Sequence, residues 1–262
     1  MIKNTRAAKV KKQYKTASNF EARSRLFKKY STNKYNWYKW IFDNSSFPAN
    51  SKILELGCGL GALWSKNKRR INKHWDITLS DFSRAMLTKT KENLRELKHK
   101  INFKVINIEK IPYKDESFDV AIANGLLYLV PDLKKSIKEI ARIIKPGGIL
   151  LASTSGSKYM KELQNLLKKS KLPVHTNYSS YQFSLENGKK LLSPYFSKIK
   201  LIRHTNSLLV TKAKPLTDYI LSSNQQLSDE QKDLVRTFFD DYFKKNKKLL
   251  SRMDNGLFIA IK

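Results

Sequence analysis

A glycine-rich turn after a short apolar run constrains the fold of this chain more than any other feature. The run Ile-Leu-Glu-Leu at residues 53–56 is followed by Gly57, Gly59 and Gly61 at alternate positions. Glycine has no Cβ atom, so the backbone N–H groups of such a turn are open to a ligand when the turn leads from a strand into a helix. The stretch therefore predicts a ligand-binding turn at the carboxyl end of a buried strand.

The residues that follow alternate between strand and helix patterns. Short apolar runs indicate strands, and apolar residues at helical spacing indicate the helices between them. The predicted strands cover residues 51–56, 75–80, 101–108, 117–125 and 149–154, and the clearest helices cover residues 81–100 and 131–148. This alternation is typical of an α/β fold with a parallel sheet and helices on both faces.

The patterns outside this block are weaker. Apolar residues within residues 19–42 recur at mostly helical spacings with a break at Ser31–Asn33, which predicts two amphipathic helices packed as a lid over the carboxyl edge of the sheet. We expect a helical lid at residues 1–50 and one domain at residues 51–262, with a helical insertion at 214–248 before the last strand. The other expected elements are a helix at 157–170, strands at 198–204 and 207–211, helices at 214–222 and 228–248, and a final strand, GLFIAIK, from Gly256.

Two carboxylates flank the glycine turn at informative spacings. Glu55 precedes Gly57 by two residues, and Asp81 follows the second predicted strand. A dinucleotide-binding turn has the pattern G-x-G-x-x-G, whereas the third glycine here comes one position early. A carboxylate beside the turn disfavours a pyrophosphate and favours an ammonium or sulfonium group, and one at the end of the second strand can accept hydrogen bonds from ribose hydroxyls. The pattern favours a nucleoside site over a dinucleotide site.

With these residues in place, the chain resembles the class I S-adenosylmethionine-dependent methyltransferases, and among them the type 11, ubiquinone-biosynthesis-like group. The resemblance covers about residues 51–154 and extends through the stretches SDFSRAML (80–87), IPYKDESFDVAIANGLLYLVPD (111–132) and EIARIIKPGGILLAST (139–154). It implies a Rossmann-like, seven-stranded, mostly parallel sheet in which the last strand is antiparallel and lies beside the fifth.

The resemblance also implies which residues hold S-adenosylmethionine. Glu55 would lie near the methionine amino group, Asp81 would bind the ribose hydroxyls, and Phe82 would pack on the adenine. Asn107 stands where many relatives have aspartate, and its amide oxygen could still accept from the adenine amino group. The lid hypothesis adds Tyr30 as a hydrogen-bonding residue. The full set of expected cofactor-binding residues is Tyr30, Glu55, Gly57, Cys58, Gly59, Asp81, Phe82, Asn107, Ile108 and Asn124.

No catalytic residue is identified by the sequence. Methyl transfer is an in-line displacement at the sulfonium methyl group, and it needs no fixed base when the acceptor is already nucleophilic. Tyr128 after the fourth strand, and His175 and Tyr178 after the helix at 157–170, are candidates for a general base, although packing or surface roles are commoner for such residues. Histidines and acidic residues show no metal-ligand spacing, so we expect no metal site.

The strong positive charge leaves the acceptor open. The chain has 52 Lys and Arg against 22 Asp and Glu, a net charge of +30. Such a charge favours binding to nucleic acid, but an evenly distributed lysine excess is also typical of a solvated surface. Three hypotheses follow: a methyltransferase acting on a small molecule, which we favour; an RNA methyltransferase for ribosomal or transfer RNA; and a non-enzymatic S-adenosylmethionine-binding module.

Cysteine content and hydropathy bound the remaining possibilities. Cys58 is the only cysteine, so a disulfide within the chain and a cysteine-based metal cluster are excluded. The basic amino-terminal segment is followed by no apolar signal region, and no apolar run is long enough for a bilayer span. We therefore expect a cytoplasmic protein without membrane contacts, and the sequence does not indicate an oligomeric state.

Overall fold

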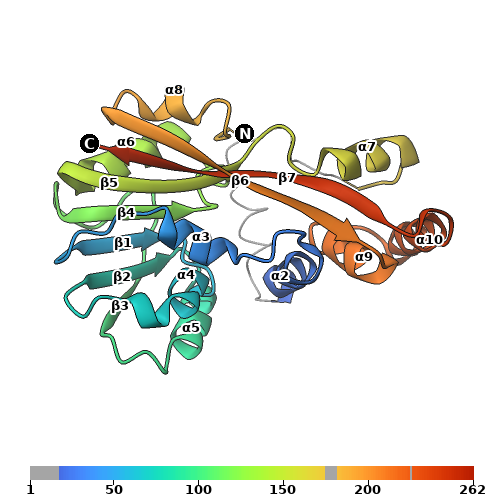
Figure 1. The fold of residues 1–262 in the computed structure, drawn as a ribbon, viewed down its shortest axis with the longest axis horizontal. Coiled ribbons are helices and arrows are strands. Elements are labelled where there is room, and N and C mark those ends of the chain that lie inside the picture. The colour runs from blue at the N-terminus through green and yellow to red at the C-terminus, as the bar shows by residue number, and fades with distance from the viewer. Residues whose placement is uncertain (1–17, 175–181, 225) are drawn as a thin grey trace.

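The described residues form a seven-stranded sheet in the order β3-β2-β1-β4-β5-β7-β6 (Figure 1). The computed structural model describes residues 18–174, 182–224 and 226–262. The strands are β1 (Lys52–Leu56), β2 (Asp76–Asp81), β3 (Ile101–Val105), β4 (Phe118–Asn124), β5 (Ile144–Ser155), β6 (Lys198–Val210) and β7 (Leu249–Ile261). Strands β1 to β5 are parallel, whereas β7 is antiparallel to both β5 and β6. The predicted α/β sheet and the antiparallel last strand beside the fifth are confirmed.

Helices lie on both faces of this sheet and beyond its carboxyl edge. They are α2 (Ser18–Tyr30), α3 (Trp37–Asp43), α4 (Ala62–Lys66), the 3-10 helix η1 (Lys68–Arg70), α5 (Arg84–Asn93), α6 (Leu133–Ile143), α7 (Lys161–Ser170), α8 (Gly188–Leu192), α9 (Ala213–Ser222) and α10 (Asp229–Asn246). Helices α6 and α8 cover one face, and α3, α4 and α5 contribute to the core on the other.

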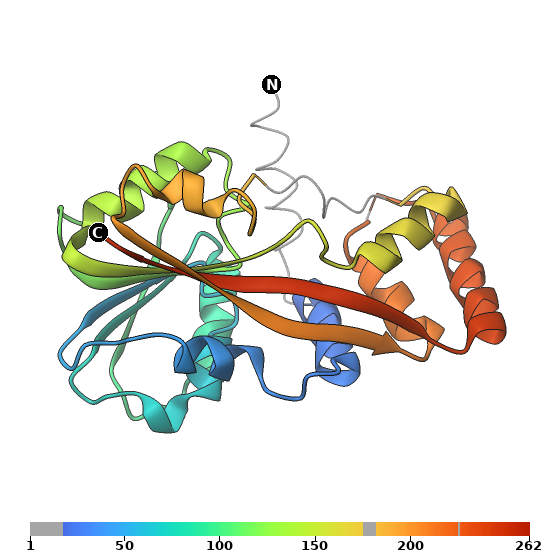
Figure 2. The same ribbon diagram turned by 45° about the horizontal axis from the view of Figure 1, so that its top comes forward.

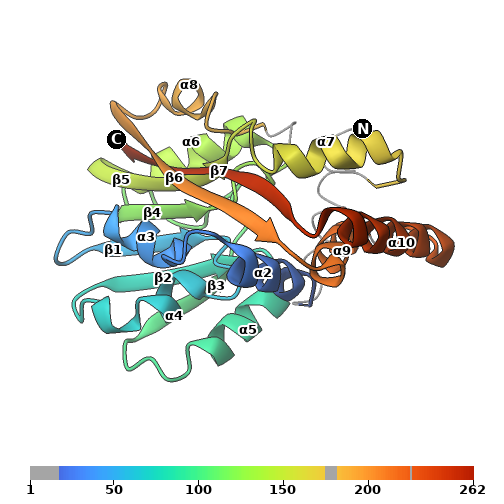
Figure 3. The same cartoon turned by 45° about the vertical axis from the view of Figure 1, so that its right-hand side comes forward.

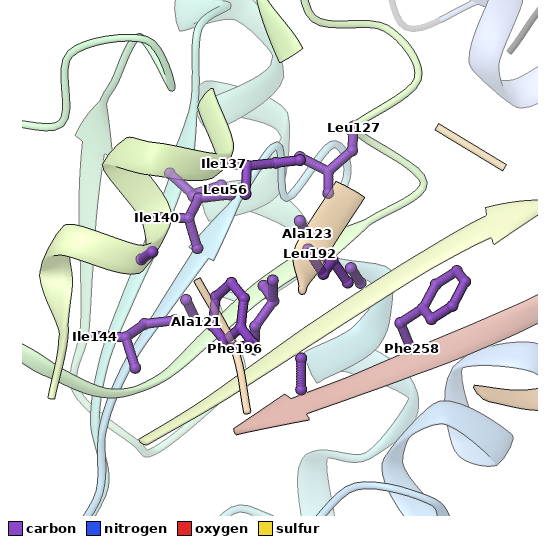
Figure 4. Packing of buried hydrophobic residues seen from close by; sticks show 14 of the residues in the cluster. Leu56, Ala121, Ala123, Leu127, Ile137, Ile140, Ile144, Leu192, Phe196 and Phe258 are labelled. Carbon is purple, nitrogen blue, oxygen red and sulfur yellow. The ribbon is translucent and has the colours of Figure 1, made fainter. Parts of the chain in front are cut away.

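The two faces are apolar because side chains alternate along each buried strand. On the face of α6 and α8, Leu56 of β1 and Phe258 of β7 pack with Ile137, Ile140 and Leu192 from the helices (Figure 4). All five side chains are almost completely buried. Burial on both faces makes the central strands the rigid base from which their carboxyl ends project.

Strands β6 and β7 extend beyond the parallel strands and carry a second helical layer. Each has 13 residues, whereas β5 pairs with β7 only from Ile149 to Ser155. Helices α2, α7, α9 and α10 pack around the distal half of this hairpin (Figures 1, 2 and 3). Leu26, Leu208 and Phe239 belong to one buried cluster there. The insertion expected at residues 214–248 contains α9 and α10, so the insertion and α2 share a hydrophobic core.

The structure corrects the predicted strands in this hairpin. The strands expected at 198–204 and 207–211 are one continuous strand, β6. The sequence predicts a last strand that begins at Gly256, but β7 begins at Leu249 and Gly256 lies within it. A Cβ at Gly256 would lie 2.8 Å from the carbonyl oxygen of Ile202 on β6. The glycine therefore allows close approach between strands and does not mark a strand end.

Three other boundaries differ from the prediction. Helix α6 ends at Ile143, three residues before Pro146, because proline disfavours helical geometry at the preceding residue. Strand β5 then begins at Ile144 and contains an irregularity before Ile149, where its register with β4 shifts. Strand β3 ends at Val105 rather than at residue 108.

The amino-terminal segment forms two helices with a break between them, as predicted. Helix α2 packs on α9, where Phe27 and Tyr219 make an edge-to-face contact, and it lies beyond the carboxyl ends of the parallel strands (Figures 1 and 3). Helix α3 instead packs on a face of the sheet, where Ile41 and Phe42 are buried in the same cluster as Trp64 of α4. The prediction that both helices cover the carboxyl edge is therefore wrong for α3, because its apolar side fills the sheet core.

Candidate functional site

The carboxyl ends of β1, β2 and β4 bring most of the expected cofactor-binding residues together. Strand β1 lies between β2 and β4 in the sheet. Because neighbouring parallel strands end at the same edge, the glycine turn after β1, Asp81 at the end of β2 and Asn124 at the end of β4 meet there. This edge is the candidate site.

The glycine turn between β1 and α4 leaves open space at its centre. Gly57, Gly59 and Gly61 have φ values of 66°, 58° and 71°, a left-handed region that side chains rarely adopt. A Cβ on Gly57 would lie 2.9 Å from Leu126, and one on Gly61 would lie 2.8 Å from Thr90. A Cβ on Gly59 would meet no atom within 4 Å. Gly57 and Gly61 therefore lie close against neighbouring side chains, and Gly59 forms an open cradle.

Helix α5 holds this turn in place. The Thr90 hydroxyl donates to the Gly59 carbonyl at 2.5 Å, and the Asn93 side-chain amide donates to the Leu60 carbonyl at 3.0 Å. Cys58 is buried within the turn, and burial raises the pKa of its thiol well above the usual range. A neutral buried thiol is a packing group, so Cys58 contributes through its backbone and small size.

Asp81 connects the glycine turn to the start of α5. Its Oδ2 accepts a hydrogen bond of 3.2 Å from the Gly59 N–H, and its Oδ1 accepts one of 2.9 Å from the Ser83 N–H. The side chain is buried, and burial raises the pKa of Asp81 although backbone N–H groups stabilise the carboxylate. Each oxygen keeps a second lone pair, so the carboxylate can still accept hydrogen bonds from a ligand at the cradle.

Glu55 is more deeply buried than the sequence suggested. Its Oε2 accepts a hydrogen bond of 2.6 Å from the indole Nε1 of Trp64 on α4, and the residue is 2% exposed. Burial raises the pKa of Glu55 to about 7, and the Trp64 hydrogen bond opposes that shift. Sequence analysis missed Trp64, which anchors this carboxyl group. The spacing of nine residues between them carries no signal without the geometry of the intervening turn.

An exposed aromatic ring lies directly after Asp81. Phe82 is 40% exposed, unusually so for a large apolar side chain beside a buried carboxylate. Asn107 is exposed in a turn after β3, where its Oδ1 accepts from the Glu109 N–H at 3.0 Å, and Ile108 is half-buried. The Asn107 oxygen thus organises the turn, and its side-chain amide donor has no partner in the described structure.

At the end of β4, Asn124 lies in a short polar network. The Ser153 hydroxyl donates to the Asn124 Oδ1 at 2.5 Å and accepts from the Gly125 N–H at 2.9 Å. Gly125 has a φ of 64°, and a Cβ built on it would lie 3.7 Å from the Tyr128 hydroxyl. The structure therefore places the candidate base Tyr128 beside the end of β4. Sequence analysis missed Ser153, whose role depends on pairing between β4 and β5.

Tyr30 lies in another environment. It is 6% exposed in the cluster formed by α2, α9 and the distal hairpin, and its hydroxyl has no hydrogen-bond partner among the described residues. Its expected role toward the cofactor stays a prediction. His175 and Tyr178 lie outside the described residues.

Metal sites and membrane spans are the two remaining features to consider. Within residues 18–174, 182–224 and 226–262, no group of three or more His, Cys, Asp or Glu side chains could hold a metal ion. Among the helices of those same ranges, none combines the length and hydropathy needed to cross a bilayer.

Comparison with known proteins identifies the family. A model described as a methyltransferase domain matches residues 48–234. The ubiquinone/menaquinone biosynthesis C-methyltransferase UbiE of Pectobacterium atrosepticum is 29% identical over 132 residues, which cover 50% of this chain and 53% of UbiE. The chain thus spans about half the length of the UbiE relatives that it matches.

Solved structures share the fold across most of the chain. A putative methyltransferase from Bacillus halodurans is 15% identical to this chain, with a TM-score of 0.61. The match covers 86% of this chain and 98% of the B. halodurans protein. A second structure is phosphoethanolamine N-methyltransferase 2 of Haemonchus contortus, solved with phosphomonomethylethanolamine and S-adenosylhomocysteine. It is 15% identical, with a TM-score of 0.54, and the match covers 87% of this chain and 52% of the H. contortus protein. The family model covers well over half of the sequence, and the chain therefore belongs to the methyltransferase domain family.

Proposed function

We infer that the protein is an S-adenosylmethionine-dependent methyltransferase that acts on a small-molecule acceptor. The observation that carries this inference is the cradle at Gly59, with its N–H bonded to the buried Asp81 and the exposed ring of Phe82 next along the chain. These groups fit a nucleoside: open backbone for close approach, a carboxylate for ribose hydroxyls, and an apolar face for a base.

Each end of the cofactor has residues of suitable chemistry. Asp81 would accept from the ribose hydroxyls, and Phe82 would pack against the adenine, with Asn107 and Ile108 at the same end. Glu55 and the backbone carbonyl of Asn124 would face the methionine ammonium group. When bound, S-adenosylmethionine supplies an electrophilic methyl group.

Orientation of the acceptor supplies the rest of the catalysis in this proposal. Several relatives are C-methyltransferases of ubiquinone and menaquinone biosynthesis, and their name says that they transfer the methyl group to carbon. We assign the Tyr128 hydroxyl, which lies near Gly125, to orientation or deprotonation of the acceptor. Helix α2 and the distal hairpin lie beyond the carboxyl edge, where they would limit access of a large acceptor (Figure 3).

Binding of S-adenosylhomocysteine tests the cofactor site. Gly59→Ala should abolish the calorimetric signal, since the new methyl group occupies the cradle. Gly147→Ala is a matched control, because Gly147 also has a positive φ of 74° and open space around its Cβ position but lies in β5 at the other end of the sheet. Equal affinity of the two variants would refute the assignment of the cradle, as would tighter binding of NADH than of S-adenosylhomocysteine.

A second experiment distinguishes the acceptor classes. The protein is incubated with methyl-labelled S-adenosylmethionine, a panel of phenolic and quinol acceptors, and total RNA. We expect label in the solvent-extractable fraction. Label confined to RNA would support the RNA methyltransferase alternative, which the net charge of +30 suggests. Cofactor binding without any transfer would support the non-enzymatic alternative.

A further inference from the structure

A basic cleft lies at the opposite edge of the sheet from the glycine turn. It has a volume of about 920 Å³ and is formed by η1, the loop before β2, the turn between α5 and β3, and the starts of those strands. Its basic lining residues are Lys68, Arg69, Lys73, Lys98 and Lys100, and its acidic ones are Asp76 and Glu96. Three chain segments that are separate in sequence therefore converge on one concave surface.

Positive charge in this cleft is incompletely neutralised. Five of the lining side chains are Lys or Arg, and two are acidic. Glu96 already pairs with Lys68 at 3.8 Å, and Asp76 accepts a hydrogen bond from Asn102 at 3.0 Å. The other four cations, Arg69, Lys73, Lys98 and Lys100, are exposed and form no ion pair within the described residues. Four unpaired cations that share one concavity raise the local potential for an anion.

The cleft lies away from the candidate methyl-transfer site. Asp76, in the cleft, begins β2, and Asp81, beside the glycine turn, ends it. Five residue steps along a strand span about 17 Å. A ligand in the cleft is therefore separated from the cofactor site by the length of the strand, and it is not the methyl acceptor.

The lining favours phosphate groups over bases. Among the described residues, Trp75 is the only Phe, Tyr or Trp in the lining, and it is 8% exposed with its indole nitrogen donating to the Pro48 carbonyl at 2.9 Å. The described lining therefore offers no such ring to stack on a base, and recognition would depend on charge along a phosphate backbone. We propose that this cleft docks the phosphate backbone of a nucleic-acid strand without sequence preference. This docking is independent of which acceptor the enzyme methylates.

Salt-dependent binding of a labelled oligouridine strand tests the proposal. The cleft variant carries Arg69→Gln, Lys73→Gln, Lys98→Gln and Lys100→Gln. The control variant removes the same charge from α7 and α8, through Lys168→Gln, Lys169→Gln, Lys189→Gln and Lys190→Gln, all at exposed positions. Four lost phosphate contacts should lower the slope of log affinity against log salt by about 3 in the cleft variant. The control variant should keep the slope and affinity of the unmodified protein.

The outcomes separate the cleft from diffuse charge. Equal loss in both variants, or loss in neither, would overturn the proposal. Stronger cleft-dependent binding to phosphatidylglycerol vesicles than to oligouridine or duplex DNA would overturn the assignment to nucleic acid. Both variants should bind S-adenosylhomocysteine like the unmodified protein, which shows that they are folded and keeps this test separate from that of the cofactor site.

Discussion

The indole nitrogen of Trp64 donates a hydrogen bond of 2.6 Å to Glu55, whose carboxyl group is buried beside the glycine turn. Burial of a carboxylate favours its protonated form, and the pKa of Glu55 is raised to about 7 from 4.5. At pH values between 4.5 and about 7, the folded protein therefore retains a proton that the unfolded chain has released. Stability must fall with increasing pH across that window.

We predict that Glu55→Gln removes this part of the pH dependence. The unmodified protein should lose about 3 kcal/mol of unfolding free energy relative to the variant between pH 4.5 and pH 7, since each unit of pKa difference corresponds to about 1.4 kcal/mol. Urea unfolding at a series of pH values measures the difference. Glu230→Gln, at an exposed position on α10, controls for the loss of one acidic residue. A difference between unmodified protein and Glu55→Gln that does not change with pH would contradict the prediction.

Asp81 should be required for cofactor affinity and less so for folding. Asp81→Asn keeps an oxygen for the Gly59 or Ser83 N–H but loses the negative charge and one acceptor. Two weakened hydrogen bonds to ribose hydroxyls correspond to a loss of about 2–3 kcal/mol in binding of S-adenosylhomocysteine. Calorimetry measures this loss, with Asp76→Asn at the other end of β2 as the control. Unchanged affinity in Asp81→Asn would remove Asp81 from the site.

Helix α2 should depend on Asn206 for its attachment. The Asn206 side chain bonds to the Ser31 hydroxyl, the Thr32 hydroxyl and the Asn33 N–H, which ties the segment between α2 and α3 to β6. Asn206→Ala should increase hydrogen exchange at residues 31–36 and lower the unfolding free energy by about 1–3 kcal/mol. Thr205→Ala, on the neighbouring exposed residue of the same strand, is the control. Equal exchange in both variants would show that α2 is held by its apolar contacts alone.

The lid hypothesis can be tested by deletion of residues 1–35. This deletion spares Ile41 and Phe42, which belong to the sheet core. If α2 covers the acceptor, methyl transfer should be lost while S-adenosylhomocysteine still binds. Transfer to the native acceptor at the full rate would refute a lid role.

The sheet and the glycine turn could be predicted because their signals are local. Each strand or helix is indicated by the pattern of neighbouring residues, and the glycine turn is indicated by glycines at a fixed spacing. The contacts of Glu55 with Trp64, and of Asn124 with Ser153, connect different elements and have no local pattern. The break expected between residues 204 and 207 and the strand start expected at Gly256 are wrong, although asparagine and glycine disfavour strands on average. The Asn206 side chain forms hydrogen bonds to the segment after α2, and Gly256 allows the backbone of β6 to approach closely.

The insertion of β7 between β5 and β6 has a consequence for synthesis of the chain. Ser155 on β5 hydrogen-bonds to Asn255 on β7, 100 residues later, and in the described sheet β6 is an edge strand whose neighbour is β7. Until residues 249–261 leave the ribosome, β6 and the open edge of β5 both present unpaired backbone groups. Such long-range closure slows folding and exposes the nascent chain to aggregation. Completion of this sheet therefore depends on capture of β7 by β5 and β6 at once.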